Sequence, residues 1–313
     1  MKRKIISKRE NNFTFILDVL DVKCNLPITI LPKHIFKKAE PVQVKAIQEF
    51  SQNTHKMGLP CNPYEHEIVK NKSGSFSWKP LKFKKDWKYY IIQFKGSNDK
   101  IGDLEYISNL STLGLNFGFT TLGKHGLISN PISLVNYLFF APISHSPKVV
   151  TETLLKELGK LYKDFKKIEK HYPEIKRSVH IFHSINSIPK SSDFRILGLF
   201  ITIESLLTHA PTPKDPTDSL GRQIKSKIPL INHRVDKPIS HEKHFGEINE
   251  DNLWKKLYSY RSSVAHGNMP DFTNDLKILK NNMTVYNYLH QVTKMLLRQA
   301  LIEPKLFKDL KKC

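Results

Sequence analysis

The chain contains little cysteine. Among its 313 residues there are only three, Cys24, Cys61 and Cys313. Their odd number and wide spacing exclude a disulfide framework and a cysteine zinc site. Sparse cysteine of this kind is typical of a reducing compartment, so we expect a cytoplasmic protein.

A long apolar run is also missing. The longest apolar stretch, Ile196–Ile203, lies between Arg195 and Glu204 and is far too short to cross a bilayer. The basic residues at positions 1–10 are followed by no apolar segment, which argues against a secretory signal. We therefore expect no association with a membrane.

Acidic residues are few. The chain has 29 of them against 50 lysines and arginines, a net charge of +21 that is spread over both halves. A field of this sign favours association with a polyanion such as RNA. Lysine supplies most of the positive charge alongside abundant isoleucine, asparagine and phenylalanine, and an AT-rich genome gives the same mixture without any nucleic-acid role. Composition leaves both explanations open.

The order of sequence patterns predicts two domains. Residues 1–145 have no P-loop, no Rossmann glycine fingerprint and no internal repeat, and they are predicted to form an α+β sensing or regulatory domain. Strands are expected over 13–22, 28–31 and 87–94, a helix over 40–51, and mostly loop with a little strand over 52–86. The mixed segment 102–140 receives no assignment.

Residues 146–313 are predicted to form an all-α bundle after a junction at Ala141–Pro147. The helix expected over 193–209 is almost entirely apolar, which places it at the centre of the bundle. The other helices are expected over 150–168, 174–187, 218–231 and 251–265, with a long last helix whose apolar stripe runs from Phe272 to Leu296.

The segment 251–268 carries the most specific pattern. Its apolar residues recur at helical spacing, and Gly267 is suited to the left-handed conformation that ends a helix. Arg261 and His266 are five residues apart, about 140° around an ideal helix, so they point apart unless the helix ends at the glycine. If the helix ends there, an arginine fork and a titratable imidazole can face one phosphate, which is a pair suited to RNA cleavage.

The spacing alone is not specific. Two other arginine–histidine pairs have similar spacing: Arg177 with His183, expected within a helix, and Arg234 with His241, expected in a loop. His180 and His183 are interpreted as polar-face histidines, because no third metal ligand stands near them. Only the pair of Arg261 and His266 has the flanking sequence Tyr-x-x-Arg-Ser-x-x-x-His-Gly.

That flanking sequence resembles the signature of the HEPN superfamily, in particular its ApeA-like branch. Residues 258–267 carry the resemblance, Tyr-Ser-Tyr-Arg-Ser-Ser-Val-Ala-His-Gly. Residues 195–209 are similar to the branch's apolar helix with an embedded glutamate, and residues 220–231 are similar in position and character. In all, the resemblance spans roughly 175–303.

The resemblance implies an all-α bundle that dimerises and cuts RNA without metal or other cofactor. Arg261 and His266 match the catalytic pair, with Glu204, Tyr258 and Ser262 in supporting positions. Many catalytic members have asparagine, aspartate or histidine directly after the arginine, whereas this chain has Ser262, a residue that also occurs there in the ApeA-like branch.

Glu204 is expected to need a partner. It lies between Phe200 and Leu207 on a stripe that is otherwise apolar, and a buried carboxylate must be paired or protonated. The resemblance packs this helix against the helix of Arg261, so Arg261 is the expected partner. A different basic group or a helix N-terminus is the alternative.

Three functions are compatible with these features. The first is a metal-independent endoribonuclease of the anti-phage or toxin type, with RNA as substrate, a second copy as partner, and a phage-derived trigger or a neutralising partner as regulator. The second is a non-catalytic HEPN-like dimer that binds RNA or acts as a scaffold. The third places the main activity in residues 1–145, where no catalytic constellation is recognisable.

A composite site requires a dimer. We expect a homodimer through the C-terminal bundle, with the Arg261 helices of the two copies facing each other, because one protomer supplies a single Arg–His pair. Light scattering at micromolar concentration measures this directly. A monomer that still cleaves RNA would rule out the composite site.

Overall fold

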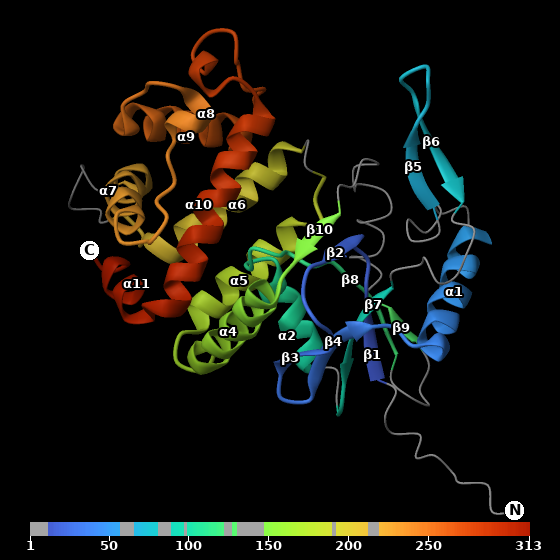
Figure 1. Ribbon diagram of the computed structural model, residues 1–313. Coiled ribbons are helices and arrows are strands. Elements are labelled where there is room, and N and C mark those ends of the chain that lie inside the picture. Colours follow the sequence, from blue (N-terminus) through green and yellow to red (C-terminus); the bar gives the residue numbers. More distant parts are fainter. Residues whose placement is uncertain are drawn as a thin grey trace, which may run out of the picture. The chain divides into compact units, whose positions relative to one another are not determined.

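The computed structural model describes residues 12–56, 66–80, 89–96, 99–121, 127–129, 147–189, 192–211 and 219–313. The chain divides into two compact units, residues 1–162 and 163–313, and the dividing point lies within helix α4. An antiparallel sheet with helices is followed by a mostly helical region, as predicted (Figure 1). The predicted junction Ala141–Pro147 lies outside the described residues except for Pro147.

The first unit is built on a six-stranded antiparallel sheet in the order β3-β4-β7-β1-β8-β9. These strands are β1 (Asn12–Ile16), β3 (Ile28–Leu31), β4 (His34–Lys38), β7 (Tyr90–Phe94), β8 (Phe117–Thr121) and β9 (Leu127–Ser129). Two smaller pairs accompany it: β2 (Leu20–Val22) runs parallel to β10 (Lys148–Val150), and β5 (His66–Lys70) pairs with β6 (Phe76–Pro80).

Helix α1 (Pro41–Lys56) covers one face of the sheet. Its Ile47 is buried in a cluster of mostly aromatic side chains from the strands and their ends, namely Phe13, Phe15, Leu17, Tyr89, Ile91 and Phe119. This unit also contains α2 (Asp99–Ser108) and the first part of α4 (Glu152–Ile168). The sheet therefore has its own apolar core, as expected of an α+β domain.

The predicted strand 13–22 is two strands. The chain leaves β1 because Asp18 is buried and polar: its carboxylate accepts the backbone N–H of Asn116 at 2.6 Å and pairs with Lys148 at 2.7 Å. The strands predicted over 28–31 and 87–94 are confirmed by β3 and β7. In the segment without an assignment, the structure forms α2, β8 and β9.

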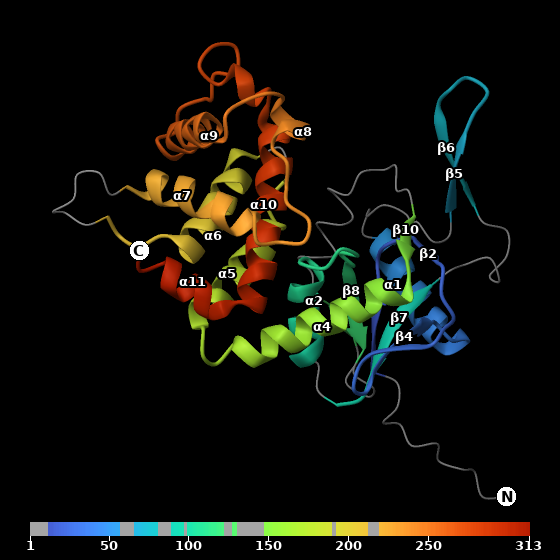
Figure 2. The ribbon, with the colours of Figure 1, turned by 60° about the vertical axis from the view of Figure 1, so that its left-hand side comes forward.

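The second unit is a helical bundle. It contains α5 (Pro173–Ile185), α6 (Asp193–Leu207), α7 (Leu220–Asn232), α8 (Glu242–Phe245), α9 (Glu250–Ala265), α10 (Asn282–Ile302) and α11 (Pro304–Leu310). Helix α6 packs against α5, α7, α9, α10 and α11, which agrees with its predicted place at the centre of the bundle. In both views α10 runs alongside α6 (Figures 1 and 2).

One expectation about this bundle is wrong. The last helix begins at Asn282 rather than near Phe272, because Lys280 has a left-handed backbone (φ 65°) and the Asn281 side chain caps the new helix at the Thr284 N–H, 2.9 Å away. The intervening residues form only a short 3₁₀ turn, Lys277–Leu279. Part of the surface of α6 remains exposed, at Phe194 and Ile201.

Gly159 fixes how closely α4 approaches the sheet. A Cβ at this position would lie 2.4 Å from the backbone carbonyl oxygen of Ile30 in β3. Gly159→Ala should therefore lower the free energy of unfolding of the first unit by about 1–3 kcal/mol, since the backbone must shift. Gly102→Ala in α2, where a Cβ meets nothing within 4 Å, should be neutral or slightly stabilising. Thermal unfolding of both variants makes the comparison, and equal melting temperatures would contradict the close contact.

Candidate functional site

Helix α9 begins and ends at recognisable caps. The Asn249 side chain accepts the Asp251 N–H at 2.9 Å at the start. At the end, Gly267 adopts φ 75°, its N–H donates to the Val264 carbonyl at 3.0 Å, and the Asn268 N–H donates to the Ser263 carbonyl at 2.9 Å. This is the glycine-terminated helix end that the sequence predicts. His266 is consequently the first residue past the helix.

The apolar face of α9 is anchored by Tyr260. Leu253, Leu257 and Tyr260 are fully buried, as the helical spacing predicts. The Tyr260 hydroxyl lies 3.1 Å from Asp193 Oδ1 at the start of α6 and 2.9 Å from Asn282 Oδ1 at the start of α10. Burial and the charge of Asp193 raise the pKa of Tyr260, so the hydroxyl remains a hydrogen-bond donor. These polar contacts join α6, α9 and α10 in one polar cluster.

On a neighbouring part of α9, Arg261 pairs with Glu204 of α6. Arg261 Nε lies 3.2 Å from Glu204 Oε1, and Nη2 donates to Oε2 at 3.3 Å. The Nε–H is not aligned for a hydrogen bond, so Nε attracts the Glu204 carboxylate only through its charge. The side chains are only 14% (Glu204) and 26% (Arg261) exposed. The predicted partnership is confirmed, and Arg261 is not a free surface arginine.

Tyr258 completes the cluster. Its hydroxyl donates to Glu204 Oε1 at 3.0 Å, and the Arg261 guanidinium carbon lies 5.6 Å from the centre of its ring. Burial, followed by the neighbouring carboxylate, raises the pKa of Tyr258, which keeps the phenol protonated as a donor. A Cβ at Gly221 of α7 would lie 3.3 Å from Tyr258 Cδ1, so that glycine makes room for the tyrosine. Glu204 thus accepts hydrogen bonds from two donors, and Arg261 contacts both the Glu204 carboxylate and the Tyr258 ring.

His266 and Ser262 are placed differently from this cluster. The exposed His266 contributes its backbone N–H to the Ser262 carbonyl at 3.0 Å. No hydrogen bond or ring contact joins the imidazole to Arg261 among the residues that the structure describes. Ser262 is half-buried. The structure therefore brings together Arg261, Glu204 and Tyr258, with His266 accessible at the end of the same helix.

The two other arginine–histidine pairs lie on other elements of the bundle. Arg177 and His183 both lie on α5, and burial, followed by the neighbouring His180, lowers the pKa of His183 to about 4. The His183 side chain is half-buried on α5. Arg234 pairs with Glu303 at 2.7 Å, and His241 Nε2 lies 2.8 Å from the Ile248 carbonyl oxygen in the expected loop.

Metal ligands do not gather in the described ranges: no group of three or more histidine, cysteine or acidic residues there has the arrangement to hold an ion. Nor is any helix of those ranges long and apolar enough to span a membrane. Comparisons with protein-family models, with curated proteins and with solved structures found no match.

The sequence did not predict the polar cluster of Tyr260, Asp193 and Asn282. The signal available was a tyrosine at an apolar position of the α9 stripe, which indicates that its hydroxyl has a partner. It does not identify that partner, because the three residues are far apart in the sequence and meet only when the helices pack.

Loss of the Glu204 carboxylate should destabilise the bundle. Glu204→Ala leaves Arg261 and the Tyr258 hydroxyl without their acceptor, and we expect a loss of about 2 kcal/mol, below the value for a fully buried pair because Arg261 retains access to water. Chemical denaturation measures it. Arg234→Ala, which breaks an exposed pair, is the control and should leave unfolding unchanged. Equal behaviour of the two variants would show that Glu204 is solvated.

Proposed function

We propose that the protein is a metal-independent endoribonuclease of the HEPN type that acts as an anti-phage or toxin-type effector in the cytoplasm. The observation that carries the proposal is the cluster around Arg261. A half-buried arginine is held by Glu204 and Tyr258 near the end of a helix, and an accessible histidine follows directly after that end. The resemblance of residues 258–267 to the HEPN signature and the net charge of +21 agree with an RNA substrate.

The chemistry follows from the substrate. RNA carries its own nucleophile, the 2′-hydroxyl, so a protein has to move two protons and stabilise the phosphorane. His266 of one copy would accept the proton from the 2′-hydroxyl, and His266 of the other copy would donate a proton to the leaving 5′-oxygen, because an imidazole can take either role. Arg261 would bind the phosphate oxygens through its fork. The bond from phosphorus to the 5′-oxygen breaks as the 2′-oxygen bonds to phosphorus, leaving a 2′,3′-cyclic phosphate and a 5′-hydroxyl.

Glu204, Tyr258 and Ser262 would act indirectly, by holding Arg261 and His266 in position. Glu204 and Tyr258 are positioning residues, because their contacts fix the plane of the Arg261 guanidinium. Ser262 carries the carbonyl that holds the His266 backbone. A second copy would bring a second Arg–His pair into one cleft. The first unit would sense a phage-derived trigger or restrain the nuclease, and a neutralising partner would be a second means of control.

One observation favours a non-catalytic alternative. The Arg261 guanidinium already has a carboxylate within the fold, so a phosphate must share or displace it. If Glu204 always retains Arg261, the pair is structural and the protein is an RNA-binding or scaffolding dimer.

Cleavage of RNA by the purified full chain in EDTA separates the two functions. We expect cleavage without metal, with a loss of at least about 100-fold in His266→Ala, because proton transfer by a positioned histidine contributes that much. RNA binding by His266→Ala should be retained, since one imidazole adds little to the field of a chain with a net charge of +21. Arg261→Ala should lose cleavage to a similar degree and also bind RNA more weakly.

Matched controls come from exposed residues elsewhere in the bundle. His171→Ala and Arg222→Ala remove an exposed histidine and an exposed arginine and should cleave like the wild type. Arg261→Lys keeps a cation beside Glu204 but loses the fork, and should fold while remaining slow. Cleavage that disappears in EDTA, or equal losses in the control variants, would contradict the assignment. RNA binding without any cleavage would favour the non-catalytic alternative.

A further inference from the structure

Helix α6 is apolar on nearly all its faces, yet the fold does not bury all of them. A helix that is hydrophobic all round is normally enclosed on every side. Here Phe194 is 69% exposed and Ile201 is 45% exposed. Single exposed apolar residues are common on protein surfaces and need no explanation. These two differ because they line the same groove.

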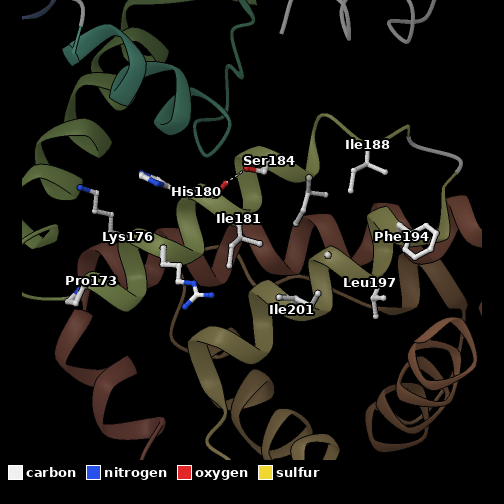
Figure 3. A pocket seen from close by; sticks show the side chains of 12 residues that line it. Pro173, Lys176, His180, Ile181, Ser184, Ile188, Phe194, Leu197 and Ile201 are labelled. Atoms are coloured by element: carbon white, nitrogen blue, oxygen red, sulfur yellow. Dashed lines mark hydrogen bonds between the residues drawn. The ribbon is translucent and has the colours of Figure 1, made fainter. Parts of the chain in front are cut away.

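The groove lies between α5 and α6 and has a volume of about 630 Å³. On the α6 side, its lining residues have the spacing of one helical face: Phe194, Leu197, Gly198 and Ile201. On the α5 side the apolar lining is Ile181, Ile185 and Ile188. Figure 3 shows these side chains along the two helices. A Cβ at Gly198 would lie 2.8 Å from Ile185 Cγ1, so the glycine permits the close approach of the helices beneath the groove.

The other end of the groove is basic. Lys176, Arg177 and His180 line it, and none of the lining residues is acidic. In Figure 3, Lys176 and His180 lie toward Pro173, whereas Ile188 and Phe194 lie at the opposite end. Lys176 is 3.5 Å from Glu169, which partly offsets its charge. The exposed Arg177 forms no ion pair with any residue in the described part of the chain.

We infer that this groove binds an amphipathic helix of a partner protein, whose acidic residues lie against Arg177 and whose apolar stripe lies against Phe194 and Ile201. Helices that dock in grooves do so through apolar anchors one and two turns apart, which is the spacing of the α6 lining. The basic end selects the charge and the direction of the bound helix.

Two other occupants fit less well. An RNA strand would gain little from the apolar end, since phosphate contacts need cations along the whole path. A second copy of this chain would offer the same face, which has no carboxylate for Arg177. An amphipathic helix with acidic residues at one end matches both the basic and the apolar ends of the groove.

A displayed library of single amphipathic helices, about four turns long, tests the inference without knowledge of the natural partner. The library fixes apolar residues at the anchor spacing and randomises every other position. Selected against the full-length wild type, the enriched helices should carry a net acidic charge at one end. Phe194→Ala and Ile201→Ala should each weaken the selected helix by about tenfold, the effect of losing one anchor.

Charge reversal and exposed controls make the test specific. Arg177→Glu should weaken acidic helices and enrich basic ones in a repeated selection. Leu230→Ala and Arg222→Glu, at exposed positions on α7, should leave binding unchanged. Failure to enrich any helix, enrichment without acidic bias, or binding indifferent to Phe194→Ala would overturn the inference. A dimer that Phe194→Glu dissociates would assign the face to a second copy and would also overturn it. None of these outcomes depends on Arg261 or His266, so they are independent of the proposed nuclease.

Discussion

A carboxylate within an apolar helix constrains how this bundle packs. Glu204 lies on α6 between the buried residues Ile203 and Leu206, and its side chain is only 14% exposed, so the carboxylate needs donors from the protein. Arg261 and Tyr258 of α9 supply them, which sets the rotation of α9 against α6. Once α9 is placed in this way, its end and His266 are placed too. The candidate site therefore depends on one ion pair between two helices.

Contacts of two further residues, Tyr260 and Gly221, also position the site. Tyr260, two residues from Tyr258, reaches the starts of α6 and α10 and fixes the tilt of α9. Gly221 gives the Tyr258 ring the space it occupies beside α7. Removing a single contact of this kind changes the orientation of Arg261 as well as the stability of the bundle, so kinetic and stability effects must be measured together in any variant.

Much of this arrangement could be predicted because its signals are local. The helical spacing of Leu253, Leu257 and Tyr260 and the glycine at 267 determine α9 and its end, and both lie where expected. The pairing of Glu204 with Arg261 was predicted from burial cost and from a resemblance that packs the two helices together. By contrast, the start of α10 depends on the left-handed Lys280 and the Asn281 cap, which the continuous apolar stripe conceals.

Signals that depend on tertiary packing could not be read from the sequence. The break after β1 arises because Asp18 meets Asn116 and Lys148, which follow it by 98 and 130 residues in the chain. An apolar helix such as α6 predicts burial, but which of its faces remains open depends on where α5 lies. The low pKa of His183 likewise follows from its surroundings rather than from its place in a motif.

The proposed reaction is cleavage of RNA by Arg261 and His266 through the RNA's own 2′-hydroxyl. The most direct measurement uses a short RNA that the full chain cleaves at one position, together with the same RNA carrying a 2′-O-methyl group at that nucleotide, both in EDTA. The account predicts that the unmodified strand yields a 2′,3′-cyclic phosphate and that the methylated strand is not cut there. Cleavage of the methylated strand at the same position would contradict it.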